Sequence, residues 1–75
     1  MKKVYINEDY RMGIDLADAY CSKKSALFNY FFGWRESTRH KMGDEMTFCH
    51  MYKLPKAVAN MIIELSLDET EVTVV

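Results

Sequence analysis

Glycine, proline and cysteine are all scarce in this sequence. Its 75 residues include 3 glycines, 1 proline and 2 cysteines. The glycines lie at positions 13, 33 and 43, too far apart to form the glycine-rich loop that holds a phosphate or a dinucleotide. Two cysteines form at most one disulfide, whereas small secreted domains that depend on disulfides usually carry four or more. We therefore expect a reduced, cytoplasmic protein.

Long apolar runs are also missing. The most apolar window, residues 57–65, contains Asn60 and Glu64 and is far shorter than the roughly 20 residues that cross a bilayer. Charged residues interrupt the N-terminal segment in the same way, so no secretory leader is expected. These features exclude a membrane as a predicted partner.

Neither sign of charge dominates. The chain has 10 basic and 11 acidic residues, a formal net charge of −1, which excludes the overall positive field of a dedicated nucleic-acid binder. The two halves differ, however. Residues 1–41 carry eight basic and five acidic residues, or +3, and residues 42–75 carry two and six, or −4. This asymmetry predicts one basic and one acidic patch on a nearly neutral surface.

Apolar residues make up 49% of the chain and aromatic residues 13%, a composition typical of a folded domain. A core in a chain of this length supplies about 3–5 kcal/mol of net stability. A homodimer contact or a bound partner would add to this stability. The length leaves room for a single domain over residues 1–75.

The hydrophobic pattern indicates alternating strands and helices. Residues 2–7 alternate as in a half-buried strand. Apolar side chains then recur at helical spacing at Leu16, Tyr20, Leu27 and Phe31. This segment is one helix, or two that meet at a bend near Lys23, and Gly33 is its expected end. Residues 34–41 and 46–53 predict a hairpin around a turn at 42–45.

The second half ends with a helix and a strand. Pro55 is suited to the first turn of a helix, and an apolar stripe continues to about Ser66. The stripe consists of Val58, Ala59, Ile62, Ile63 and Leu65. Val72 and Val74 then indicate a closing strand.

The expected order is therefore strand, helix, strand, strand, helix, strand. This is a ferredoxin-like βαββαβ order, with two helices on one face of a single antiparallel sheet. If residues 34–41 form a loop, the fold is a three-stranded variant. In both cases we expect an α+β domain.

The second arm of the hairpin supplies the candidate protein-binding site. One face of this strand consists of Met46, Phe48, His50 and Tyr52, and the other of Thr47, Cys49, Met51 and Lys53. Both faces are moderately apolar, so the sequence does not decide which one is core. If the first set is exposed, its aromatic and Met side chains form an adaptable apolar patch of the kind that binds proteins.

The first arm supplies an alternative, a nucleic-acid interface. Arg35, Arg39 and Lys41 would share one strand face, with Trp34 beside them for base stacking. A solvated basic strand next to a core tryptophan is the simpler interpretation of the same residues.

The element order is also that of RNA recognition motifs, which stack bases on aromatic residues of two strands. The run Val4-Tyr5-Ile6-Asn7 loosely resembles their first-strand signature, and Phe48 and Tyr52 lie in the expected third strand. The resemblance implies base stacking on these aromatic residues. The third strand lacks the family's glycine and basic start, so we do not assign the chain to this family.

Catalytic and metal-binding patterns are weak. Cys21, His40, Cys49 and His50 lack the paired spacing of a zinc site, and adjacent strand residues such as Cys49 and His50 point to opposite faces. His40 could approach Cys49 across the hairpin, but no third group for a catalytic triad is evident. We expect no enzyme activity, no metal and no cofactor.

The sequence thus favours a small protein-binding module, acting as a regulator, adaptor or inhibitor through its hairpin or sheet face. Domains of this size without catalytic motifs are frequent among accessory proteins of phages and mobile elements. The alternative function is nucleic-acid binding by the basic hairpin.

Overall fold

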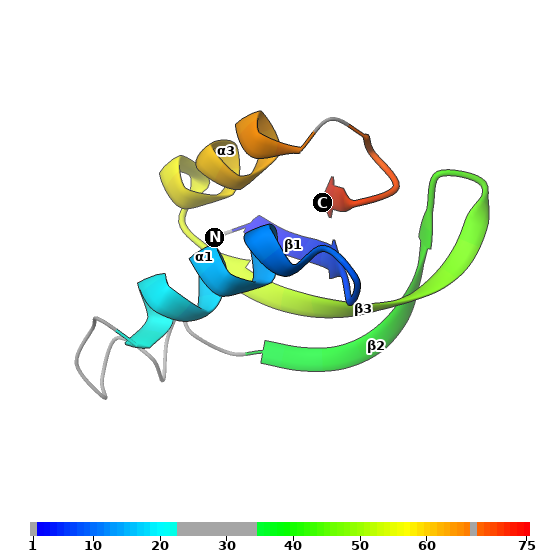
Figure 1. Ribbon diagram of the computed structural model, residues 1–75, viewed down its shortest axis with the longest axis horizontal. Helices are drawn as coiled ribbons and strands as arrows, with labels where there is room; N and C mark the ends of the chain where they lie inside the picture. Colours follow the sequence, from blue (N-terminus) through cyan, green and yellow to red (C-terminus); the bar gives the residue numbers. More distant parts are fainter. Residues whose placement is uncertain (1, 23–34, 67) are drawn as a thin grey trace.

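Two helices and a four-stranded antiparallel sheet form the part of the chain that the structure describes. This computed structural model describes residues 2–22, 35–66 and 68–75. Its elements are β1 (Lys2–Asn7), α1 (Arg11–Ser22), β2 (Arg35–Met42), β3 (Glu45–Leu54), α3 (Lys56–Leu65) and β4 (Val72–Val74) (Figure 1). The predicted α+β class is confirmed, with four strands rather than three. The predicted helix beyond Ser22, its end at Gly33 and the candidate Trp34 lie outside the described residues.

The strands are ordered β2-β3-β1-β4, so β2 and β4 lie at the two edges of the sheet. β1 pairs with β3 from Lys2 opposite Leu54 to Asn7 opposite Cys49. β3 continues beyond that point and pairs with β2 as far as the turn. The far half of the β2–β3 hairpin therefore extends past the end of β1, and Figure 1 shows it bending upward toward the loop before β4.

The main core lies between the sheet and the helices. Even-numbered residues of β1, β3 and β4 point to the helix side because alternate strand residues share a face. They meet the buried stripes of both helices in one hydrophobic cluster, which places the two helices on the same face. The cluster consists of Val4, Ile6, Ile14, Ala17, Tyr52, Leu54, Val58, Ala59, Ile62 and Val72.

Helix α1 begins earlier than the sequence pattern indicates. It starts at Arg11, whereas the helical spacing begins at Leu16, so the buried Gly13 lies in its first turn. A Cβ atom at Gly13 would lie 2.7 Å from Cδ2 of Tyr10 and 3.2 Å from Cγ2 of Ile6. The missing side chain therefore lets the helix approach β1 closely.

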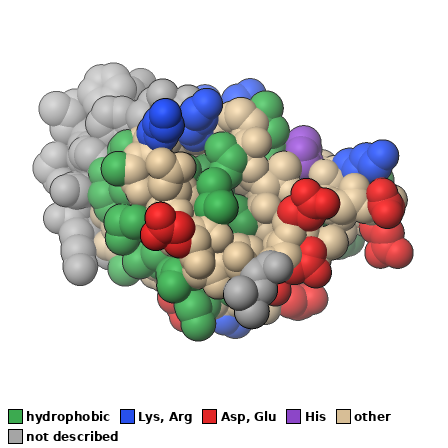
Figure 2. Space-filling view, turned by 90° about the horizontal axis from the view of Figure 1, so that it is seen from above, with side chains coloured by type: hydrophobic (Ala, Val, Ile, Leu, Met, Phe, Trp, Pro, Cys, Tyr) green, Lys and Arg blue, Asp and Glu red, His purple; other side chains and the backbone are tan. Residues whose placement is uncertain are grey.

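Helix α3 follows Pro55 as predicted, but part of its expected buried stripe is exposed. Val58, Ala59 and Ile62 are buried, whereas Ile63 and Leu65 are exposed. The core covers a narrower arc of this short helix than the full apolar pattern spans. Figure 2 shows hydrophobic side chains on the outer surface near α3 and acidic side chains toward the hairpin end.

The sheet also has buried side chains on its other face, where no described helix lies. Met42, Cys49 and Met51 are buried there. The rings of Tyr5 and His40 stack on this face at 3.8 Å between centroids, with an interplanar angle of 7°. Both faces of β3 are therefore partly core, which explains why its sequence is apolar on both sides.

Curvature of the hairpin encloses this second face. A Cβ atom at Gly43, in the turn, would lie 2.6 Å from Cγ2 of Thr70, so the turn reaches the loop that precedes the opposite edge strand. An open hollow of about 460 Å³ remains between them. Its lining residues are Asn7, Met42, Asp44, Glu45, Thr47 and Thr70.

Candidate functional site

The hairpin register brings the two predicted site sets onto the same face. Residues opposite each other in an antiparallel pair share a face. The pairs on the helix side are Arg35 with Tyr52, Ser37 with His50, Arg39 with Phe48, and Lys41 with Met46. The basic residues of the nucleic-acid hypothesis therefore lie directly opposite residues of the protein-binding hypothesis, on one face of the hairpin.

Tyr52 does not belong to an exposed site, which corrects the sequence-based prediction. Its relative exposure is 0%. The ring packs in the helix-side core, and its hydroxyl donates a hydrogen bond to Oδ1 of Asp18 at 2.7 Å. The period-two pattern identified its face correctly, but α1 covers that end of the face.

Asp18 of α1 organises the covered end of this face. Its Oδ2 atom accepts a hydrogen bond from Nη1 of Arg35 at 2.8 Å, while Oδ1 accepts from Tyr52. Arg35 is therefore committed to an internal ion pair and is less available to a ligand. Sequence reasoning did not single out Asp18. Asp18 follows Ala17, which is buried on the apolar side of the helix, and a carboxylate at such a position could have indicated a buried polar contact.

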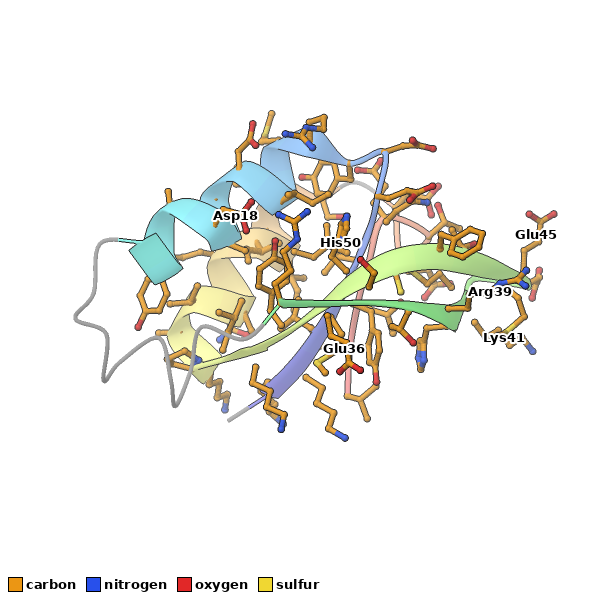
Figure 3. The ribbon with its side chains drawn as sticks, turned by 90° about the horizontal axis from the view of Figure 1, so that it is seen from below. Asp18, Glu36, Arg39, Lys41, Glu45 and His50 are labelled. Atoms are coloured by element: carbon orange, nitrogen blue, oxygen red, sulfur yellow. The ribbon has the colours of Figure 1, made fainter. Side chains whose placement is uncertain are left out.

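His50 lies between α1 and the hairpin, as Figure 3 shows, and is half-buried. Its Nδ1 atom is 3.4 Å from Oγ of Ser37. Burial lowers the pKa of His50, and the positive charge of Arg35 lowers it further. The charges of Glu8 and Asp18 act in the opposite direction on this pKa, and Arg11 adds a smaller lowering effect.

The lowered pKa of His50 predicts how stability depends on pH. Since the folded state disfavours the imidazolium, the unfolded state binds more protons between the folded pKa and the ordinary histidine value of about 6.5. The free energy of unfolding should therefore fall as the pH drops below about 6.5, until the folded-state pKa is passed. Urea denaturation at closely spaced pH values measures this slope.

A His50→Gln variant should lose this part of the slope. His40→Gln is the matched histidine control, and it should keep the contribution of His50. An unchanged slope in His50→Gln would contradict the assignment of the effect to this imidazole.

Beyond His50, the helix-side face of the hairpin is open. Met46 and Phe48 have relative exposures of 58% and 56%. The guanidinium carbon of Arg39 lies 4.9 Å from the centroid of the Phe48 ring, within cation–π distance. Lys41 lies directly across from Met46. We call these four residues, Arg39, Lys41, Met46 and Phe48, the hairpin face.

The backbone of the hairpin face is supported by the rest of the fold. The carbonyl oxygen of Phe48 accepts a hydrogen bond from the amide of Glu8 at 3.4 Å. Figure 3 shows Arg39 and Lys41 toward the turn end of the hairpin, with Glu36 on the opposite side of β2 from His50. The exposed apolar and basic groups are therefore carried by paired strands rather than by a loop.

The other face of the sheet holds two further candidate residues. Tyr5 stacks on His40 there, away from Phe48, so it cannot share a base-stacking platform with the hairpin face. The thiol of Cys49 donates to the carbonyl oxygen of Thr38 at 3.7 Å. Burial raises the pKa of Cys49, and the charge of Glu8 raises it further, which disfavours the nucleophilic thiolate.

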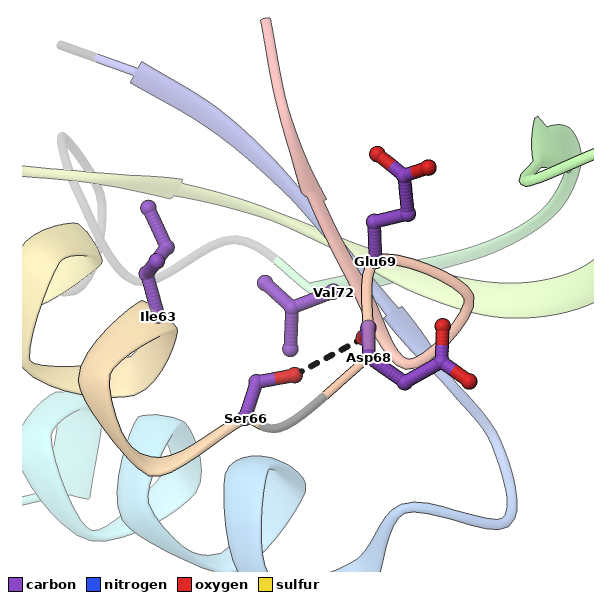
Figure 4. Close-up of a pocket in the computed structure, with 5 residues that line it drawn as sticks. All are labelled: Ile63, Ser66, Asp68, Glu69 and Val72. Carbon is purple, nitrogen blue, oxygen red and sulfur yellow. Dashed lines mark hydrogen bonds between the residues drawn. The ribbon is translucent and has the colours of Figure 1, made fainter.

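Two further hollows lie among the described residues. One of about 190 Å³ is lined by Ile63, Ser66, Asp68, Glu69 and Val72 (Figure 4). Within it Oγ of Ser66 donates to the carbonyl oxygen of Asp68 at 3.0 Å, and Oδ1 of Asp68 accepts from the amide of Thr70 at 2.9 Å. These are local bonds of the turn before β4.

Another hollow, of about 240 Å³, is lined by Asn7, Asp9, Tyr10 and Glu71. The buried hydroxyl of Tyr10 has no hydrogen-bond partner among the described residues. Burial and the nearby Glu71 charge raise the pKa of Tyr10, so the phenol stays protonated. Oδ1 of Asn7 is already used, since it accepts from the amide of Asp9 at 2.9 Å.

Comparisons with protein families, curated proteins and solved structures find no match for this chain. Among residues 2–22, 35–66 and 68–75, no three His, Cys, Asp or Glu side chains lie close enough together to hold a metal ion. None of the helices in that part of the chain has the length and apolarity that crossing a membrane requires.

Proposed function

We propose that this chain is a protein-binding module whose contact surface is the hairpin face. The observation that supports this proposal is that Phe48 and Met46 are exposed next to each other on β3. Arg39 and Lys41 lie directly opposite them on β2. Aromatic, Met and Arg side chains are enriched in protein interfaces, and burying one large apolar side chain contributes about 1.5–3 kcal/mol. Such a surface suits an adaptor, a regulator or an inhibitor.

Presentation on strands strengthens the proposal. Phe48 is held in a paired strand, and Arg39 covers one side of its ring at 4.9 Å. A preorganised anchor loses little conformational entropy when it binds, so more of its burial energy appears as affinity. Arg39 and Lys41 would then select an acidic rim on the partner.

Replacing Phe48 with alanine should weaken partner binding by more than about 1 kcal/mol. The test is capture from a lysate of the source cells, with and without nuclease, followed by quantitative mass spectrometry. The wild-type chain should retain a stoichiometric protein that survives nuclease, and Phe48→Ala should lose it.

Met61→Ala on α3 is the matched control, because Met61 is also exposed, at 52%, and lies outside the hairpin face. This control should capture the same protein as the wild type. Equal capture by Phe48→Ala would contradict the proposal. Capture that disappears with nuclease and with Arg39→Ala would favour the nucleic-acid alternative instead.

A further inference from the structure

The edge strand β2 carries a second kind of binding surface, its outer backbone edge. Among the described residues β2 pairs with β3 alone. It runs from Arg35 to Met42, whereas the other edge strand, β4, spans only Val72–Val74. In an antiparallel ladder alternate residues direct both N–H and C=O away from the partner strand, so a long edge strand can accept another strand.

The charge on β2 is sorted by face. Its helix-side row is Arg35, Ser37, Arg39 and Lys41, and its other row is Glu36, Thr38, His40 and Met42. Arg35 is paired with Asp18 at 2.8 Å. In the part of the chain that the structure describes, neither Arg39 nor Lys41 has a carboxylate within ion-pair distance. The edge therefore has two adjacent cations of one row that are available to a partner.

This row opposes pairing of β2 with a second copy of itself. A two-fold antiparallel pair keeps each row on one face. Centring the pair on Thr38 places Arg35 opposite Lys41, and centring it on Ser37 places Arg35 opposite Arg39. Centring it on Arg39 sets that side chain against its own copy, and a shift by one more residue sets Arg39 against Lys41. Like charges directly opposite each other are destabilising. The effect is strongest in the registers centred on Arg39 and one residue beyond it, because Arg35 is already paired with Asp18.

We propose that the β2 edge binds an extended acidic segment of another protein, which adds to the sheet as a further strand. The segment would run antiparallel to β2, as all paired strands of this sheet do, and would carry carboxylates at two positions i and i+2, opposite Arg39 and Lys41. This inference rests on the proposed protein-binding function and names the chemistry of its partner. The added strand would lie beside the hairpin face and extend it.

Synthetic peptides of ten residues test the inference directly. The probe has Glu at two alternate central positions among Thr and Val, and its control has the same composition with the two Glu adjacent. We expect the probe to bind the ¹⁵N-labelled chain about tenfold more tightly than the control. Amide exchange should slow at alternate residues of β2, and not at β4.

Backbone methylation separates strand addition from charge attraction alone. Two versions of the probe carry N-methyl groups on one backbone edge or on the other. Because only one edge can pair with β2, one version should lose binding and the other should keep it. Binding by both versions, or by neither, would overturn the inference, and so would exchange protection confined to residues outside β2.

Charge reversal supplies the matched protein variants. Arg39→Glu combined with Lys41→Glu should lower affinity for the Glu probe by about tenfold and permit binding of a peptide with Lys at the same two positions. Lys53→Glu combined with Lys56→Glu changes the net charge equally and should bind like the wild type. If a ten-residue oligothymidylate displaces the probe at equal concentration, the cations recognise phosphate and the inference fails.

The two proposals fail separately. If Phe48→Ala loses the captured partner but the probe does not protect the amides of β2, the hairpin face is supported and strand addition is refuted. If the probe protects the amides of β2 but Phe48→Ala still captures the partner, strand addition is supported and the hairpin face is refuted as the contact surface.

Discussion

Replacing Tyr52 with alanine is expected to destabilise the protein by about 3–5 kcal/mol. Tyr52 is fully buried in the helix-side core, and its hydroxyl is bonded to Asp18 at 2.7 Å. The substitution would remove the ring contacts, leave a cavity and leave one acceptor of Asp18 without its donor. Since a core of this size supplies only about 3–5 kcal/mol, Tyr52→Ala should be largely unfolded at 25 °C by circular dichroism.

Two further variants make this result interpretable. Tyr52→Phe keeps the ring and removes the hydroxyl, so it should cost about 1 kcal/mol in urea denaturation. Phe48→Ala removes an aromatic ring from the same face of the same strand, and it should change stability by no more than about 0.5 kcal/mol because that ring is 56% exposed. Similar losses in Tyr52→Ala and Phe48→Ala would contradict the assignment of one ring to the core and the other to the surface.

This contrast shows where sequence reasoning is informative. Alternation in β3 correctly placed Phe48 and Tyr52 on one face. It could not predict their different depths, because depth depends on where α1 crosses the sheet. α1 contacts the Tyr52 end through Asp18 and leaves the Phe48 end open. The two-residue alternation of a strand sequence identifies which residues share a face. Tertiary packing decides which part of that face is covered.

The second face of the sheet illustrates a limit of a different kind. Met42, Cys49 and Met51 are buried without a described helix above them. On this face the turn reaches Thr70, and the rings of Tyr5 and His40 stack, both contacts between residues distant in sequence. Local propensity and periodicity carry no information about such contacts, so the sequence left the choice of core face open.

The pairing of residues in the hairpin could have been predicted from the sequence. The turn at residues 42–45 was recognised from Gly43 and Asp44, and a two-residue turn fixes which residues lie opposite each other. Counting back from it places Arg39 beside Phe48 and Lys41 beside Met46. The register therefore brings Arg39 and Lys41 of the nucleic-acid hypothesis onto the same exposed face as Phe48 and Met46 of the protein-binding hypothesis.

Gly43→Ala should destabilise the protein by about 2–3 kcal/mol, and it tests the contact that curves the hairpin. Gly43 has a φ of 66°, the left-handed conformation that costs a residue with a Cβ atom about 1–2 kcal/mol. The new Cβ atom would also lie 2.6 Å from Cγ2 of Thr70, an overlap that costs about 1 kcal/mol or more. Urea denaturation of the single variant measures the sum of the two effects.

Thr70→Ser separates the two costs, because serine lacks the Cγ2 atom. In a Thr70→Ser background, Gly43→Ala should cost only the conformational part, about 1 kcal/mol less than in the wild type. An equal cost in both backgrounds would contradict the contact between the turn and the loop before β4. Because the turn packs against Thr70, the single variant should displace the turn and, along β2 and β3, the residues Arg39 and Phe48. Gly43→Ala should then also weaken binding at the hairpin face, although Gly43 lies outside it.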